Sequence, residues 1–244
     1  MDNISSDDYF DFIIVSQKNF LSTFRDYLDT KGKFHVNLLF FRIILSAVLS
    51  KISACFLVKL YARNLEILSY PSKIFSNSLP RFFFLFLGTA ASSIFLTVQG
   101  EDFFSTLIKI FLVHLMLVTI CTDFEQEVIF DKVILLVAIC GVIFVKYFSL
   151  PVTEHLIAGI FSGGIFFLLA LTGGIGGGDV KLMAALGFLL GKKIIDVALI
   201  GMVGGGIIAL ILLATGKKKR TDFFAYGIFF AGAAIFEILL FPSP

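Results

Sequence analysis

The chain has 244 residues, of which 58% are hydrophobic and only 16% are charged, and its mean hydropathy is +0.97. This composition excludes an ordinary soluble globular domain and is typical of an integral membrane protein. The formal net charge of +2 is small and the basic residues stand mainly at segment ends, so we expect no nucleic-acid partner. The three cysteines lack CxxC spacing, and we expect neither a metal site nor another cofactor.

The chain begins with a polar and aromatic stretch. Its first residues, MDNISSDDYFDF, are acidic and lack the basic start of a cleavable secretory signal, so we expect them to remain in the mature protein. We predict a polar or amphipathic N-terminal segment at 1–36, a first membrane segment with a short cytoplasmic loop at 37–80, and the membrane core at 81–244.

Apolar segments of membrane-spanning length fill the rest of the chain, since a helix needs roughly 20 apolar residues to cross about 30 Å of hydrocarbon. They lie at about 37–60, 81–98, 103–121, 131–149, 152–171, 175–191, 194–214 and 223–241. We therefore predict an all-α, polytopic transmembrane helical bundle of about eight segments. The first is the weakest, because Arg42, Lys51 and Lys59 interrupt it, and it either spans the membrane or lies in the interface.

Loop charge predicts the orientation of these segments. One set of loops collects most of the basic residues: Lys59, Arg63, Lys73, Arg81, Lys132, Lys181 and the run at 216–220. The other set holds the acidic N-terminus and the loops at 99–102 and 150–155, with Lys192 and Lys193 as exceptions. The positive-inside rule places the first set in the cytoplasm.

Glycine is concentrated in the string GGIGGG at 173–178, directly before Asp179. Too few residues lie between Asp179 and Gly191 to cross the bilayer, so this helix must begin upstream, within the glycine run. The sequence thus predicts a broken helix, with Asp179 slightly below the membrane surface. The GxxxG spacings elsewhere, as at Gly201 and Gly205, predict close helix packing.

Two acidic residues stand at the predicted cytoplasmic ends of membrane segments. Asp123 ends the third segment and Asp179 begins the sixth, and the two segments between them return the chain to the same face. An ionisable residue at membrane depth is a functional hypothesis by default. Two carboxyl groups in one site hold one acid beside one base, which is the arrangement that activates water for peptide hydrolysis.

Two strings around these aspartates resemble the signatures of type IV prepilin peptidases. The string GIGGGDVKLMAALGFLLG at 174–191 contains the GxGD tetrapeptide, and TDFEQEVIFDKVILL at 122–136 carries an Asp at a helix end with a second Asp eight positions on. A third likeness is FAYGIFFAGAA at 224–234. The resemblance covers about residues 81–241.

The resemblance implies a catalytic pair formed by Asp123 and Asp179, with Gly176 and Gly178 shaping the backbone beside the second. It implies that Lys181 lines the site, although a lysine at a helix end also snorkels to the interface. The implied partners are membrane lipid and a prepilin-like precursor with a basic leader and a hydrophobic segment. Cleavage would take place at the cytoplasmic face of a prokaryotic inner membrane, and the process served would be the assembly of type IV pili, protein secretion or DNA uptake.

The sequence departs from the family pattern at three places. Phe130 and Ala225 stand where proline is common, so the turns there differ in shape, and we interpret Asp131 as a helix-start residue. Bifunctional members carry a large insert with paired CxxC motifs between the first two spans. This chain lacks that insert, and N-methyltransferase activity is doubtful.

Three other interpretations remain open at this point. An ion- or proton-coupled transporter would use the same acid pair at a broken helix, but it predicts internal repeats that the sequence does not display. Proteases of the presenilin or signal-peptide-peptidase kind also use GxGD, but they carry a YD pair where this chain has Thr122 before Asp123. A non-catalytic membrane scaffold would leave the acid pair unexplained. The identity of the precursor and the oligomeric state do not follow from the sequence.

Overall fold

The computed structural model describes residues 32–173, 175–216 and 224–241, with side chains from residue 38 onward. Most of the predicted N-terminal segment 1–36 lies outside these ranges, and so does the basic run at 217–220. Throughout the described ranges, every regular element is a helix. The prediction of an all-α bundle is therefore confirmed.

Eight main helices correspond to the eight predicted segments. They are α2 (Gly32–Arg63), α4 (Ser78–Val98), α5 (Phe103–Gln126), α6 (Asp131–Tyr147), α7 (Val152–Leu171), α8 (Gly177–Leu190), α9 (Ile194–Ala214) and α10 (Gly227–Leu240). Short pieces connect them: η1 (Leu65–Ile67), α3 (Lys73–Ser76) and η2 (Gly191–Lys193). By length and composition, five apolar stretches can cross a membrane: those in α2, α4, α5 and α7, and the continuous run from α8 through α9.

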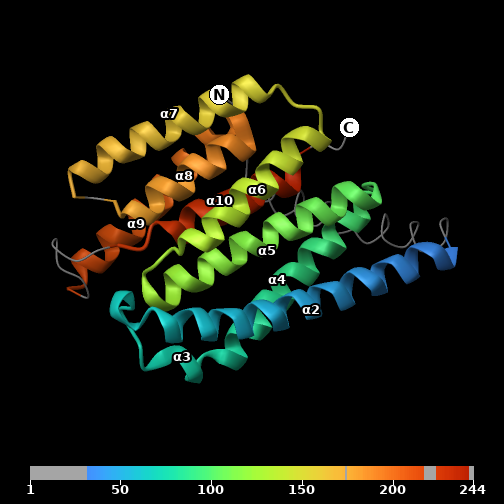
Figure 1. Ribbon diagram of the computed structural model, residues 1–244, viewed down its shortest axis with the longest axis horizontal. Helices are drawn as coiled ribbons and strands as arrows, with labels where there is room; N and C mark the ends of the chain where they lie inside the picture. Colours follow the sequence, from blue (N-terminus) through green and yellow to red (C-terminus); the bar gives the residue numbers. More distant parts are fainter. Residues whose placement is uncertain (1–31, 174, 217–223, 242–244) are drawn as a thin grey trace, which may run out of the picture.

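Helix α5 lies at the centre of the bundle. It packs against α4 on one side and against α6 and α10 on others, and it is the most buried of the candidate spans. Helix α8 lies between α6 and α7 (Figure 1) and packs on both. These neighbours bring the end of α5 and the beginning of α8 to the same end of the bundle.

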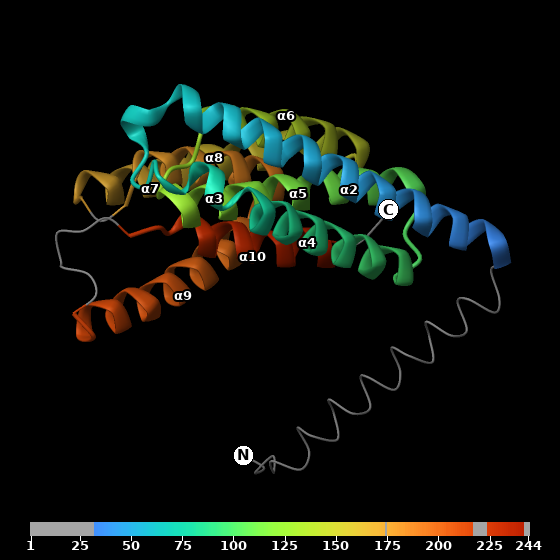
Figure 2. The same ribbon diagram turned by 90° about the horizontal axis from the view of Figure 1, so that it is seen from below.

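Glycines set the closest helix contacts, as the GxxxG spacings predict. A Cβ at Gly163 of α7 would lie 2.8 Å from the Ala184 Cβ of α8, so the absence of one allows these helices to touch. Gly201 and Gly205 allow α9 an equally close contact with aromatic rings. A Cβ at Gly201 would meet the Phe230 ring, and one at Gly205 would meet the Tyr226 ring. The rest of α9 diverges from the bundle (Figure 2).

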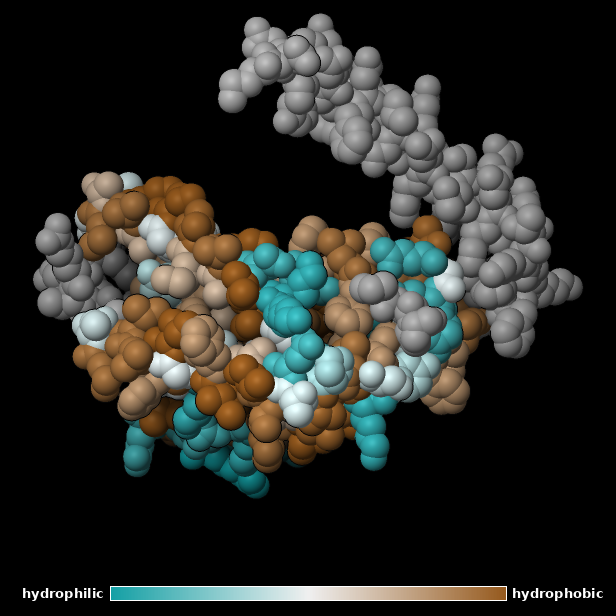
Figure 3. All heavy atoms as spheres, turned by 90° about the horizontal axis from the view of Figure 1, so that it is seen from above, coloured by the Kyte–Doolittle hydropathy of each residue, from teal (hydrophilic) through white to brown (hydrophobic). Residues whose placement is uncertain are grey.

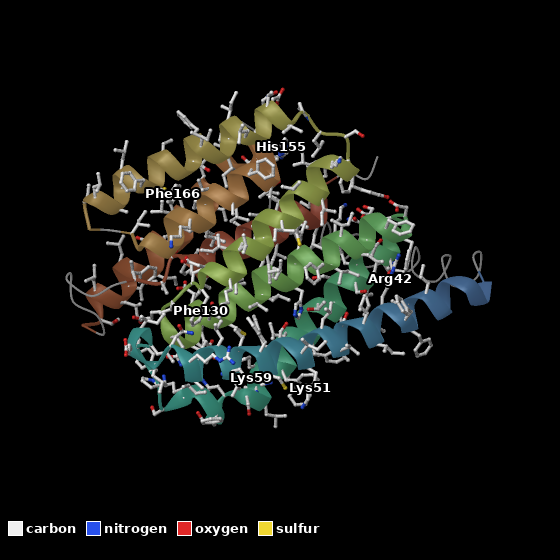
Figure 4. All side chains as sticks on the ribbon, viewed as in Figure 1. Arg42, Lys51, Lys59, Phe130, His155 and Phe166 are labelled. Carbon is white, nitrogen blue, oxygen red and sulfur yellow. The ribbon has the colours of Figure 1, made fainter. Side chains whose placement is uncertain are left out.

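The first segment forms one continuous helix that packs along α4. Arg42 is buried there, and its Nη1 donates to Thr97 Oγ1 at 2.5 Å. His114, in the middle of α5, forms hydrogen bonds with Ser53 of α2 and Thr89 of α4, each at 2.8 Å, so it joins three helices as a packing residue. Lys51 is exposed on the side of α2 that faces away from α5 (Figure 4).

The outer surface is largely apolar. Apolar residues cover wide areas of the face in Figure 3, with hydrophilic residues gathered in patches between them. The two lysines that break the predicted charge bias both have acidic partners: Lys192 lies 2.9 Å from Glu154, and Lys193 lies 3.4 Å from Asp196. Both lysines at this turn are thus part of ion pairs.

Candidate active site

The two predicted aspartates line one cavity. It has a volume of about 210 Å³ and lies where α5 ends, α8 begins and α10 begins. Its walls are formed by Asp123, Glu127, Val128, Ile129, Gly176, Gly177, Gly178, Asp179, Phe224 and Ala225. Since one water occupies about 30 Å³ of liquid, the space accommodates several water molecules beside the carboxyl groups.

Asp123 is held by the first turn of α10. It stands in the last turn of α5 with 4% of its surface exposed, and its Oδ2 accepts a hydrogen bond of 3.0 Å from the Ile228 amide. That amide belongs to a helix N-terminus, where unpaired N–H groups and the helix dipole favour a carboxylate. A Cβ at Gly227 would lie 2.8 Å from this Oδ2, so glycine is what allows the approach.

Asp179 is the third residue of α8 and is 6% exposed. Its Oδ2 accepts a hydrogen bond of 3.3 Å from the amide of Gly176, the N-cap residue. The reciprocal bond of a full capping box is absent, because glycine has no side chain. Its Oδ1 is buried, and no hydrogen-bond donor reaches it within the described part of the chain. A buried oxygen without a donor calls for an explanation, and here it is the atom available to water or to a proton.

The three glycines before Asp179 differ in their surroundings. A Cβ at Gly176 would lie 3.3 Å from Asp179 Oδ2, and one at Gly178 would lie 3.2 Å from the Ile129 Cβ. A Cβ at Gly177 would meet nothing within 4 Å. Gly177, the variable position x of the GxGD pattern, is thus the one of the three at which a side chain would have open space.

A third acidic residue, which the sequence did not lead us to expect, lines the cavity. Glu127 follows α5 in the left-handed conformation, with φ of 54°, and its amide donates to the Asp123 carbonyl at 2.9 Å. The residue lines the cavity, and the Tyr70 hydroxyl lies 3.5 Å from its Oε1. The sequence held one signal, because Glu127 stands four positions after Asp123 and that spacing places two residues on one helix face, but no local pattern marks the left-handed conformation.

The loop before α3 is fastened to the end of α5 by a paired amide contact. The Tyr70 amide donates to Gln126 Oε1 at 2.9 Å, and Gln126 Nε2 donates to the Tyr70 carbonyl at 3.0 Å. Because Gln126 follows Asp123 within one turn, this contact fixes the end of the helix that carries the aspartate.

A buried ion pair supports the same end of α5. Arg81 and Glu125 lie 2.7 Å apart with exposed fractions of 1% and 7%. The Tyr61 hydroxyl donates to Glu125 at 3.1 Å, and Arg81 donates to the Ile74 carbonyl at 3.2 Å. Arg81, counted among the basic residues of the predicted cytoplasmic side, lies in the first turn of α4 with its side chain buried against α2 and α5.

Lys181 lies beside the cavity without lining it. Its Nζ lies 2.7 Å from Asp131 Oδ1, and these side chains are 57% and 72% exposed. Asp131 is the first residue of α6, as predicted for a helix-start residue, and Phe130 precedes it in an extended conformation. The role implied for Lys181 stays a prediction.

The arrangement offers acid–base chemistry. Two carboxyl groups in one confined cavity supply one proton donor and one proton acceptor, and backbone amides fix one oxygen of each. Among the residues that the structure describes, no three His, Cys, Asp or Glu side chains gather as metal ligands.

Comparison with known proteins identifies one family. The family model described as "Type IV leader peptidase family" matches residues 110–234, which contain both aspartates and the glycines that line the cavity. No curated protein and no solved structure gives a significant match.

Proposed function

Since the chain belongs to the type IV leader peptidase family, we propose that Asp123 and Asp179 together activate water to cut the leader peptide from prepilin-like precursors. The observation that carries this proposal is that both buried carboxyl groups line one small cavity while Asp179 Oδ1 has no donor among the described residues. An aspartic endopeptidase needs such a pair.

The reaction follows from the pair sharing one proton. The ionised carboxylate takes a proton from water as the water oxygen attacks the scissile carbonyl carbon. The protonated carboxyl group gives its proton to the carbonyl oxygen, which forms a gem-diol. The nitrogen of the C–N bond then receives the proton that the first group took from water, and it leaves as the second group takes a proton back from the gem-diol. The amides of Ile228 and Gly176 keep the two groups oriented throughout, so that little reorganisation is needed.

The substrate and location rest on charge and on the family. Loop charge supports a site at the cytoplasmic face of an inner membrane, so the basic leader would be released there while the hydrophobic segment stays in the bilayer. The connection between α2 and α4 holds only the residues from Asn64 to Asn77 and no cysteine. We therefore do not propose N-methyltransferase activity.

The test is cleavage of a purified precursor by the protein in liposomes, followed as a mobility shift. Asp123→Asn and Asp179→Asn should each lower the rate at least about a hundredfold, the usual range for losing an acid–base group. Asp196→Asn is the matched control, since Asp196 is half exposed, pairs with Lys193 and lies outside the cavity. Cleavage that survives either cavity substitution refutes the pair. Proton flux that requires Asp179, in a protein that cuts nothing, would support the transporter interpretation instead.

A further inference from the structure

An apolar groove runs between α6 and α7, with α8 at its floor. Its volume is about 720 Å³, and its walls include Ala138 and Val142 of α6, Ile160 of α7 and Ala184 of α8. Helices α6 and α7 each pack on α8 but barely touch one another, so they leave the floor uncovered between them. The groove faces the outside of the bundle, where a membrane would lie.

The groove begins where the cavity of the two aspartates ends. On α8, Asp179 lines the cavity, while the next two residues, Val180 and Lys181, line the groove. On the other wall, Ile129 lines the cavity and Ile134 lines the groove. A chain that leaves the groove at this end therefore arrives beside the two carboxyl groups.

The lining suits an apolar helix. The lining includes the small, half-buried residues Ala138 of α6 and Ala184 of α8, and membrane helices associate through small residues because their backbones approach closely. Apart from Lys181, every residue in the lining is apolar or glycine. Lys181 and its partner Asp131 stand at the end next to the cavity, so charge is confined to the place where a polypeptide would leave the hydrocarbon.

We propose that this groove binds the hydrophobic membrane segment of the precursor and so delivers the peptide bond before that segment to Asp123 and Asp179. The inference rests on the proposed function and adds to it the surface that selects substrates with an apolar helix. Continuity with the cavity favours this occupant over lipid or a second copy of the chain, neither of which needs to reach the aspartates.

Photocrosslinking in liposomes tests the groove directly. Benzoylphenylalanine is placed at Val142 in the inactive Asp179→Asn protein and the intact precursor is added. Ile139 is the matched control position, because both side chains are about half exposed on α6, 54% and 48%, but only Val142 lines the groove. Position 142 lies eleven residues beyond Asp131, about 16 Å along the helix. We therefore expect crosslinks at roughly the eleventh residue after the scissile bond from position 142, and none from position 139.

Kinetics give a second measurement. Val142→Trp should lower kcat/KM for the precursor about tenfold by filling the groove, whereas Ile139→Trp should leave it unchanged. Equal crosslinking from both positions would refute the proposal that the groove binds the precursor, and so would crosslinks from position 142 only to lipid or to a second copy. Cleavage of the precursor by the wild type would still support the peptidase in either case. A wild type that cuts no precursor would instead remove the proposed function.

Discussion

The backbone amide of Ile228 donates to Asp123 Oδ2 at 3.0 Å, which ties the last described helix to an aspartate 105 positions earlier. The contact depends on Gly227, where a Cβ would lie 2.8 Å from that oxygen and 2.6 Å from the Ile129 Cδ1. The FAYG string at 224–227 therefore ends in a glycine at the point where the N-terminus of α10 packs against the Asp123 carboxylate.

Gly227→Ala should displace Asp123. We expect cleavage to fall about a hundredfold, the scale on which a shift of about 1 Å acts, while overpacking costs about 1–3 kcal/mol of unfolding free energy. Gly232→Ala on the same helix is the control, because a Cβ there meets nothing within 4 Å. Rates measured in liposomes decide it: equal activity of the two variants would show that the Ile228 contact has no part in catalysis.

Substitutions in the glycine run should have unequal effects. Gly178→Ala pushes on the Ile129 side chain and should lower cleavage about tenfold, because Ile129 forms a wall of the cavity. Gly177→Ala meets open space and should lower it much less. The comparison uses initial rates at matched protein concentration. A larger loss at position 177 than at 178 would contradict the assignment of Ile129 as the contact that matters.

Much of this architecture could be predicted from local sequence. Apolar length defined the eight segments, and the count of residues from Asp179 to Gly191 placed the start of α8 within the glycine run, where it begins at Gly177. The two aspartates followed from their positions at segment ends, and the structure brings both into one cavity. These are features that spacing along the chain determines.

Contacts between distant segments could not be predicted in this way. The partnership of Arg81 with Glu125 joins residues 44 positions apart, and nothing beside Arg81 marks it as buried rather than as a loop cation. The donor to Asp123 is a backbone amide, which has no side-chain signature. Local sequence therefore predicted which carboxyl groups meet, but not what holds them.

The Arg81–Glu125 pair should contribute to stability only as a pair. Arg81→Met leaves a buried carboxylate without its cation and should cost about 3–5 kcal/mol of unfolding free energy, measured by denaturant titration in mild detergent. The double variant Arg81→Met/Glu125→Leu should recover a large part of the loss. Lys192→Met, which breaks a solvent-exposed pair, should cost no more than about 1 kcal/mol. If Arg81→Met behaved like Lys192→Met, the pair would not anchor α5.

Glu127 offers a test of backbone strain. Glycine adopts positive φ freely, so Glu127→Gly should raise the unfolding free energy by about 1 kcal/mol, and so should Ser149→Gly at φ of 51°. Ser149 lies outside the cavity, so its variant should keep full activity. We expect Glu127→Gly to lower cleavage of a basic-leader precursor, with a weaker effect at high salt, because a cavity carboxylate is removed. If Glu127→Gly cleaved the precursor at the wild-type rate, the role of Glu127 would be structural only.

The bond between Ile228 and Asp123 also sets the order in which the protein becomes competent during its synthesis. The third predicted membrane segment and the carboxylate at its end are made long before the amide that orients this group. Until α10 has been translated and inserted, Asp123 lacks the Ile228 donor and the cavity lacks the wall formed by Phe224 and Ala225. We therefore expect a nascent chain to be harmless to other membrane proteins emerging nearby, with proteolysis beginning only when the last of these helices is in place.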